Sequence, residues 1–163
     1  GLCVFCATQH GAYYQNWETG WGLQKYAEGF PGGAGPAKLE SYIRKMSKNA
    51  GTPVPRFLQL ETRDNLPFIR KALECGHYVA GTYGFSPSKR YNGQRIYHMV
   101  NYVGVSEKWI TVHDNNFPGT WEFFPVSMFN AVHNYPYQGW VFILLSPGPP
   151  PIPNYKEFPN AIQ

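Results

Sequence analysis

The sequence predicts an α+β domain in which helices come first and an antiparallel sheet follows. In the first half, apolar residues recur at spacings of three and four, which is typical of amphipathic helices. The second half holds short runs rich in valine, tyrosine and phenylalanine, separated by glycine, asparagine and proline turns. Segregation of this kind favours an antiparallel sheet over repeated strand–helix–strand units. The 163 residues, 43% hydrophobic and 17% aromatic, suit one domain with a real core.

Three helices and one strand are expected in the first half. The segment after Cys3 is apolar nearly all round, which indicates a buried central helix. Residues 36–50 predict an amphipathic covering helix, with a proline in its first turn and a glycine after its end. Residues 52–61 contain two prolines and suit a short extended strand. A second covering helix is expected over residues 64–76, with Asp64 as its N-cap.

The second half is predicted to supply the sheet. Strands are expected at residues 77–85, 95–105, 108–114, 120–126 and 139–145. The short SEK break at residues 106–108 indicates a hairpin between the second and third of these strands. We expect one domain over residues 1–146, followed by a proline-rich extended tail over residues 147–163.

Charge and cysteine content exclude several classes of protein. The net charge is +4, but its one basic cluster lies on the expected covering helix and is interpreted as a solvated face, so no nucleic-acid partner is expected. No stretch approaches the roughly 18 apolar residues that span a bilayer. Three cysteines do not form a disulfide framework. We interpret the start at Gly1 as a loss of upstream residues, which would suit export after leader removal, although localisation stays open.

The opening segment, GLCVFCATQH, holds the candidate nucleophiles. Cys3 lies where a helix begins, and the positive end of a helix dipole stabilises a thiolate. Cys6 follows one turn later and would still feel part of that field. With His10 the two cysteines also fit a C-x₂-C-x₃-H metal pattern, which Cys75 would complete, but zinc usually binds in small loops instead of a buried helix. No metal or other cofactor is therefore expected.

A histidine and an aspartate on the predicted hairpin are candidate partners of the thiol. His98 lies near the start of one strand and Asp114 at the end of the next. Because antiparallel pairing places the start of one strand beside the end of the other, we expect these side chains to be neighbours. A Cys–His pair needs such a third group to orient the imidazole. Asn115 and Asn116 are turn formers or substitutes for that role. Surface or structural roles are expected for His10, His77 and His133.

Cysteine, histidine and aspartate follow one another along the chain in the segments GLCVFCATQHGAYYQNW, YHMVNYVGV and WITVHDNN. This order resembles that of the papain-like cysteine peptidase superfamily. The resemblance is closest to its C39-like peptidase branch, a group of poorly characterised bacterial and phage-type proteins. The resemblance implies a papain-like fold and thiol-dependent hydrolysis of an amide bond in a peptide or protein substrate. It assigns Cys3 as nucleophile, His98 as general base and acid, and Asp114 as the orienting group. The spacing from Cys3 to the aromatic Tyr14 matches the C39-like pattern.

Two features depart from the family pattern. In papain itself the second cysteine of a C-x-x-C segment is the nucleophile, which would select Cys6. Related enzymes also carry a glutamine a few residues before the nucleophile as an oxyanion donor, and only Gly1 and Leu2 precede Cys3 here. The alternative function is therefore a papain-like domain that binds a partner without turnover. The expected pocket walls are Trp17, Trp21, Tyr83 and the SPSKRYNG loop.

Overall fold

The computed structural model describes residues 1–30, 32–135 and 138–151. Within these ranges the chain forms five α-helices and one six-stranded antiparallel sheet, which confirms the predicted α+β class. None of the helices in the described ranges is long and apolar enough to cross a bilayer. Of the predicted proline-rich tail, residues 152–163 lie outside the described part of the chain.

The elements follow the predicted order closely. The α-helices are α1 (Leu2–Tyr14), α2 (Leu23–Glu28), α3 (Pro36–Ala50), α4 (Leu66–Glu74) and α5 (Phe129–His133). The strands are β1 (Phe57–Leu60), β2 (Val79–Tyr83), β3 (His98–Val105), β4 (Trp109–His113), β5 (Trp121–Pro125) and β6 (Val141–Leu144). Short 3₁₀ turns occur at η1 (Glu18–Gly22), η2 (Arg90–Gly93) and η3 (Val126–Met128).

The sheet has the strand order β1-β6-β2-β3-β4-β5, and every neighbouring pair is antiparallel. The predicted hairpin is confirmed, because β3 pairs with β4 in a register that places Asn101 opposite His113. This register brings the residue that follows β4 beside the first residues of β3, as antiparallel geometry requires. The hairpin therefore determines which side chains meet at that end of the sheet.

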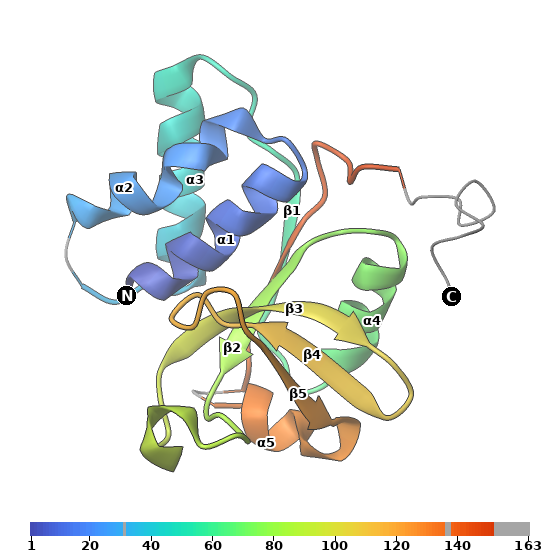
Figure 1. Ribbon diagram of the computed structural model, residues 1–163. Helices are drawn as coiled ribbons and strands as arrows, with labels where there is room; N and C mark the ends of the chain where they lie inside the picture. The colour runs from blue at the N-terminus through green and yellow to red at the C-terminus, as the bar shows by residue number, and fades with distance from the viewer. Residues whose placement is uncertain (31, 136–137, 152–163) are drawn as a thin grey trace.

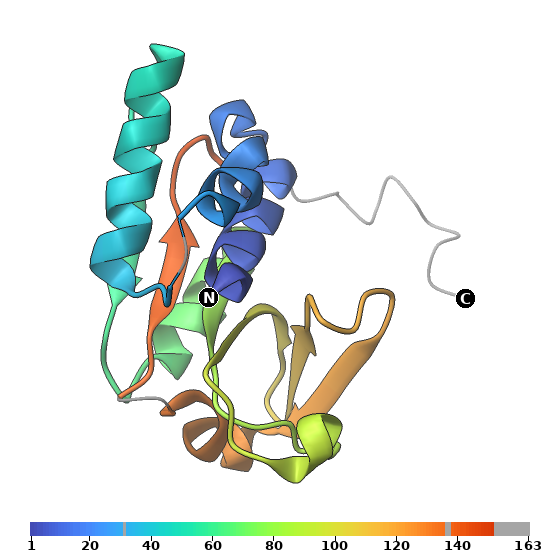
Figure 2. The ribbon, with the colours of Figure 1, turned by 90° about the vertical axis from the view of Figure 1, so that its left-hand side faces the viewer.

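Alternation along the strands divides the core into two clusters on opposite faces of the sheet. Ala80, Met99 and Phe142 pack with α1, α2 and α3, whereas their sequence neighbours Val79 and Val100 pack with α4 and α5. Figures 1 and 2 show the first three helices in one half of the molecule and the curled part of the sheet, β2 to β5, in the other. The start of α1 lies at the junction between the two halves.

One local expectation is wrong, and two short helices are not predicted from the sequence. The N-cap of α4 is Asn65 and not Asp64. Asn65 makes no side-chain capping bond, and its amide nitrogen instead lies 2.8 Å from Nε2 of the buried His133.

Helix α5, which carries His133, is not expected from the sequence, and neither is α2. Both are only five or six residues long, too short for a 3.6-residue period to be recognised. The predicted end of α3 is confirmed, since Gly51 adopts φ 65°.

Candidate active site

Three elements that are distant in the sequence converge where α1 meets the sheet. Cys3 lies in the first turn of α1, His98 is the first residue of β3, and Asp114 directly follows β4. His98 Nε2 lies 2.8 Å from Asp114 Oδ1, so the predicted adjacency of these two residues is confirmed. His98 also interacts with the thiol of Cys3. The structure thus brings together the three residues that the sequence singled out.

Asp114 is a fully buried carboxylate surrounded by donors. Its Oδ1 faces His98 and accepts the backbone N–H of Asn116 at 3.0 Å, while its Oδ2 accepts the hydroxyl of Tyr91 at 2.6 Å. Burial alone would raise the pKa of Asp114, but these hydrogen bonds and the charge of His98 lower it below its ordinary value. Asp114 is therefore an anion at neutral pH despite its burial.

His98 is held in its charged form by this anion. Burial would lower the pKa of His98, but its hydrogen bond to Asp114, its interaction with Cys3 and the negative charges of both raise the pKa to about 9. Because Nε2 is bonded to Asp114, Nδ1 is the ring nitrogen that remains for the thiol. The imidazole is thus oriented by the carboxylate on one side and offers a proton donor on the other.

The thiol of Cys3 is activated by these surroundings. Burial would raise its pKa, but the interaction with His98, the charge of His98 and the backbone N–H of Met99 together lower it. No side chain caps the start of α1, so the N–H groups of its first turn are not used by a cap. Such N–H groups favour negative charge beside them. The surroundings of Cys3 therefore favour a thiolate beside the imidazolium of His98.

Cys6 is in a different environment. Burial, followed by the charge of Cys3, raises its pKa. Its sulfur lies 3.7 Å from Nε2 of His10, whose Nδ1 lies 3.0 Å from Oδ1 of Asn101. Of the two candidate thiols, only Cys3 has a pKa shifted toward the thiolate.

The residues of the alternative metal pattern are separated in space. Cys3 faces His98, Cys6 faces His10, and Cys75 is exposed at the end of α4. Within the described residues, no group of three or more histidine, cysteine, aspartate or glutamate side chains is arranged to hold a metal ion. Cys3, the Cys6–His10 pair and Cys75 thus lie in three different environments.

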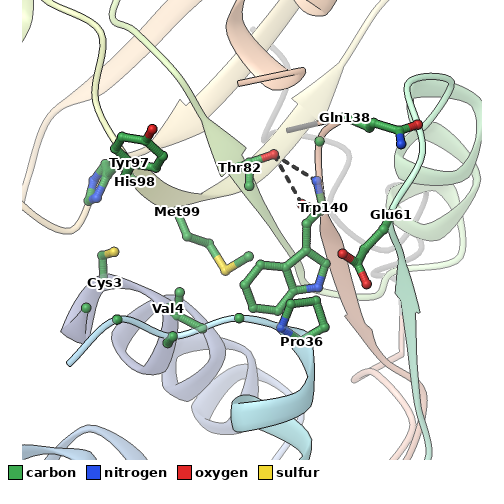
Figure 3. Close-up of a pocket in the computed structure, with 15 residues that line it drawn as sticks. Cys3, Val4, Pro36, Glu61, Thr82, Tyr97, His98, Met99, Gln138 and Trp140 are labelled. Carbon is green, nitrogen blue, oxygen red and sulfur yellow. Dashed lines mark hydrogen bonds between the residues drawn. The ribbon is translucent and has the colours of Figure 1, made fainter. Parts of the chain in front are cut away.

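A pocket of about 500 Å³ opens beside Cys3 and His98. Figure 3 shows the thiol and the imidazole at one end, with Met99, Val4 and Pro36 leading toward Trp140. The remaining lining residues are Gly1, Gly33, Ala34, Gly35, Glu61, Thr82, Tyr97, Gln138 and Gly139. The thiol therefore lies at the edge of a cavity large enough for a side chain and the adjoining backbone.

The expected pocket walls are wrong. Trp17 and Tyr83 are buried core residues, and the hydroxyl of Tyr83 donates to Glu122. Trp21 stacks on Tyr13 at the far end of α1. These aromatic side chains stabilise the fold and do not line the pocket.

The loop predicted as a wall instead supports Asp114. Tyr91, in η2, adopts φ 58°; its hydroxyl donates to Asp114, and its ring makes a T-shaped contact with the imidazole of His98, with the ring centroids 5.7 Å apart. Glu122 anchors this loop by accepting Ser86 Oγ at 2.6 Å and the Ser88 N–H at 2.8 Å. Sequence reasoning did not single out Tyr91. The adjacent Asn-Gly pair signals a turn but not the direction of the tyrosine.

Comparison with known proteins does not assign the chain to a family. No family model matches the sequence, and a search of curated proteins finds no significant match.

Proposed function

We propose that the protein is a thiol-dependent peptidase or amide hydrolase with a papain-like fold, in which Cys3, His98 and Asp114 act as a catalytic triad. The proposal rests above all on the Cys3–His98–Asp114 arrangement at the start of α1, with 2.8 Å between His98 Nε2 and the buried carboxylate. The raised pKa of His98, about 9, and the lowered pKa of Cys3 support an ion pair ready for nucleophilic attack.

Acylation begins when the Cys3 thiolate attacks the carbonyl carbon of an amide held in the pocket. A carbon–sulfur bond forms, and the carbonyl electron pair moves to the oxygen, which the first-turn N–H groups of α1 stabilise. The imidazolium of His98 gives its Nδ1 proton to the amide nitrogen as the carbon–nitrogen bond breaks. The products are a thioester on Cys3, a free amine and a neutral imidazole.

Deacylation uses the same residues, with His98 now acting first as a general base. Neutral His98 takes a proton from water while the oxygen of that water attacks the thioester carbon. Collapse of the second tetrahedral intermediate releases the carboxylic acid and regenerates the Cys3 thiolate beside the imidazolium. Throughout both steps Asp114 remains ionised and keeps the imidazole ring in place.

A binding domain without turnover is the second candidate, because no glutamine among the described residues lines the pocket beside Cys3. Gln138 is the one glutamine that lines the pocket within the described residues, and Figure 3 places it beyond Trp140, away from Cys3. In acyl-transfer enzymes the loss of one oxyanion donor costs on the order of 10²- to 10³-fold in rate. A domain of this kind would retain the pocket but hydrolyse amides slowly or not at all.

Alkylation by iodoacetamide, followed residue by residue by mass spectrometry, tests the activated thiol. At pH 6 an ordinary thiol with a pKa of about 8.5 is less than about 1% ionised. We expect Cys3 to react much faster than the exposed Cys75, the Cys6→Ala variant to keep this excess, and His98→Ala to lose it. Equal labelling of Cys3 and Cys75, or preferential labelling of Cys6, would contradict the assignment. Turnover of a fluorogenic peptide library by wild type but not by Cys3→Ala then separates the enzyme from the binding domain.

A further inference from the structure

The pocket changes in character from its catalytic end to its far end. Next to Cys3 and His98 the lining is formed by the apolar side chains of Val4 and Met99 and continues to the indole of Trp140. Beyond the indole, Figure 3 shows the carboxylate of Glu61 on the side away from the thiol. A side chain that enters from the catalytic end would thus meet apolar surface first and a carboxylate last.

The apolar part of this path is held in place by hydrogen bonds. Trp140 is 7% exposed, its indole N–H donates to Gln59 Oε1 at 3.0 Å, and its backbone N–H donates to Thr82 Oγ1 at 2.9 Å. An indole fixed in this way offers a preformed aromatic surface, which attracts both aliphatic stems and cations. Gly33 and Gly35 also line the pocket, and a Cβ at either position would meet no atom within 4 Å.

The charge of the far end is negative. Glu61 is the single carboxylate among the lining residues that the structure describes, and no lysine or arginine lines the pocket there. In the described part of the chain, Glu61 makes no ion pair with a basic side chain. The carboxylate therefore remains for a cation from outside, in a protein whose net charge of +4 would otherwise disfavour one.

We propose that this pocket selects a substrate side chain with an aliphatic stem and a cationic tip, that of lysine or arginine, next to the amide bond that is cleaved. The stem lies along Met99 and Trp140, and the tip reaches Glu61. This inference rests on the proposed function, because the thiol of Cys3 defines the end of the pocket at which the substrate backbone lies.

The test uses tripeptidyl acyloxymethyl ketones, in which the thiolate displaces a carboxylate and forms a stable thioether. Alanine occupies the other positions, and lysine, norleucine or glutamate is placed at either of the two residues next to the ketone. Norleucine has the stem of lysine without its charge. At one of these positions we expect the lysine probe to label Cys3 about three- to fivefold faster than the norleucine probe, because Glu61 is exposed and an ion pair with an exposed carboxylate contributes up to about that factor. The glutamate probe should be the slowest.

Substitution of the carboxylate identifies its contribution. Glu61→Gln should reduce the lysine preference to within about twofold, whereas the matched control Glu107→Gln, in the turn between β3 and β4, should keep it. Equal rates for lysine and norleucine at both positions in the wild type, or a preference that survives in Glu61→Gln, would overturn the inference.

A second measurement separates this inference from the proposed function. Calorimetry of the Cys3→Ala variant with the same tripeptides as amides needs no reactive thiol. Tighter binding of the lysine peptide than of the norleucine peptide supports the cationic pocket even if iodoacetamide finds no activated thiol. Equal binding of the two peptides overturns it even if Cys3 proves reactive.

Discussion

Replacing Asp114 tests the electrostatic arrangement of the site most directly. In Asp114→Ala the imidazole of His98 loses both its hydrogen-bond acceptor and the adjacent negative charge, while the burial that lowers the pKa of His98 remains. The pKa of His98 should then fall from about 9 toward its ordinary value of 6.5, with the interaction with Cys3 still raising it and burial lowering it. Without a neighbouring cation at neutral pH, the pKa of Cys3 should rise, because the charge of His98 is among the causes that lower it.

The expected size of the effect follows from the pKa of His98. A rise from 6.5 to about 9 corresponds to roughly 3 kcal/mol in favour of the imidazolium, at about 1.4 kcal/mol for each pKa unit. Asp114 and Cys3 share this stabilisation, and the hydrogen bond to Asp114 is the larger of the two. Loss of Asp114 should therefore reduce the thiolate–imidazolium population at pH 7 on the order of 10- to 100-fold. Asp114→Asn retains an acceptor for Nε2–H but no charge, so its effect should be intermediate.

The assay is the rate of Cys3 alkylation by iodoacetamide between pH 5 and 9, with the exposed Cys75 as internal reference. The control is Asp64→Ala, because Asp64 is the other aspartate of the chain and is exposed. Thermal unfolding must confirm that each variant is folded at the assay temperature. A folded Asp114→Ala protein that retains the wild-type pH profile would refute the reasoning, as would an Asn variant that reacts more slowly than the Ala variant.

Two further predictions concern stability. Tyr91→Phe removes the 2.6 Å bond to Asp114 and should lower the free energy of unfolding by about 1–2 kcal/mol in urea titrations at pH 7; an unchanged midpoint would contradict this. Burial lowers the pKa of His133 to about 4. Between pH 6.5 and 4 the unfolded chain therefore binds a proton at this histidine that the folded protein does not bind. The free energy of unfolding should thus fall by about 3 kcal/mol as the pH falls through this range. His133→Gln should remove that part of the pH dependence, measured by urea unfolding at both pH values, and an unchanged slope would contradict the prediction.

Strand pairing explains why part of the site could be predicted from the sequence. The adjacency of His98 and Asp114 follows from two strands, a short turn and antiparallel register, all of which are local and periodic features. The contact between α1 and β3 has no such local origin, because it depends on how the helix packs across the sheet. The hairpin makes His98 a candidate partner of the thiol, but it is the family resemblance that selects Cys3, because periodicity alone does not separate Cys3 from Cys6.

Side chains on irregular segments escaped prediction for a physical reason. Tyr91 reaches Asp114 because three consecutive residues of its loop, Tyr91 to Gly93, have positive φ, and a small change in any of these dihedrals would redirect the ring. Glu61 follows β1 and Trp140 precedes β6, and the antiparallel pairing of Leu60 with Val141 brings both residues to the pocket from positions about 80 residues apart in the sequence. The capping error at Asp64 has a similar cause, since the tertiary contact of Asn65 with His133 prevails over local helix chemistry.

The tripeptide Asp114–Asn116 makes hydrogen bonds to both elements that carry the site, the start of α1 and the start of β3. Asp114 holds the imidazole of His98, and the backbone N–H of Asn116 supports the same carboxylate at 3.0 Å. Between them, the Asn115 amide donates to the backbone carbonyl of Cys3 at 3.2 Å and to that of Met99 at 3.4 Å. One turn therefore positions the start of α1, the start of β3 and the orienting anion together. The thiol and the imidazole are thus both linked to this turn, and these hydrogen bonds add to the packing of α1 against the sheet.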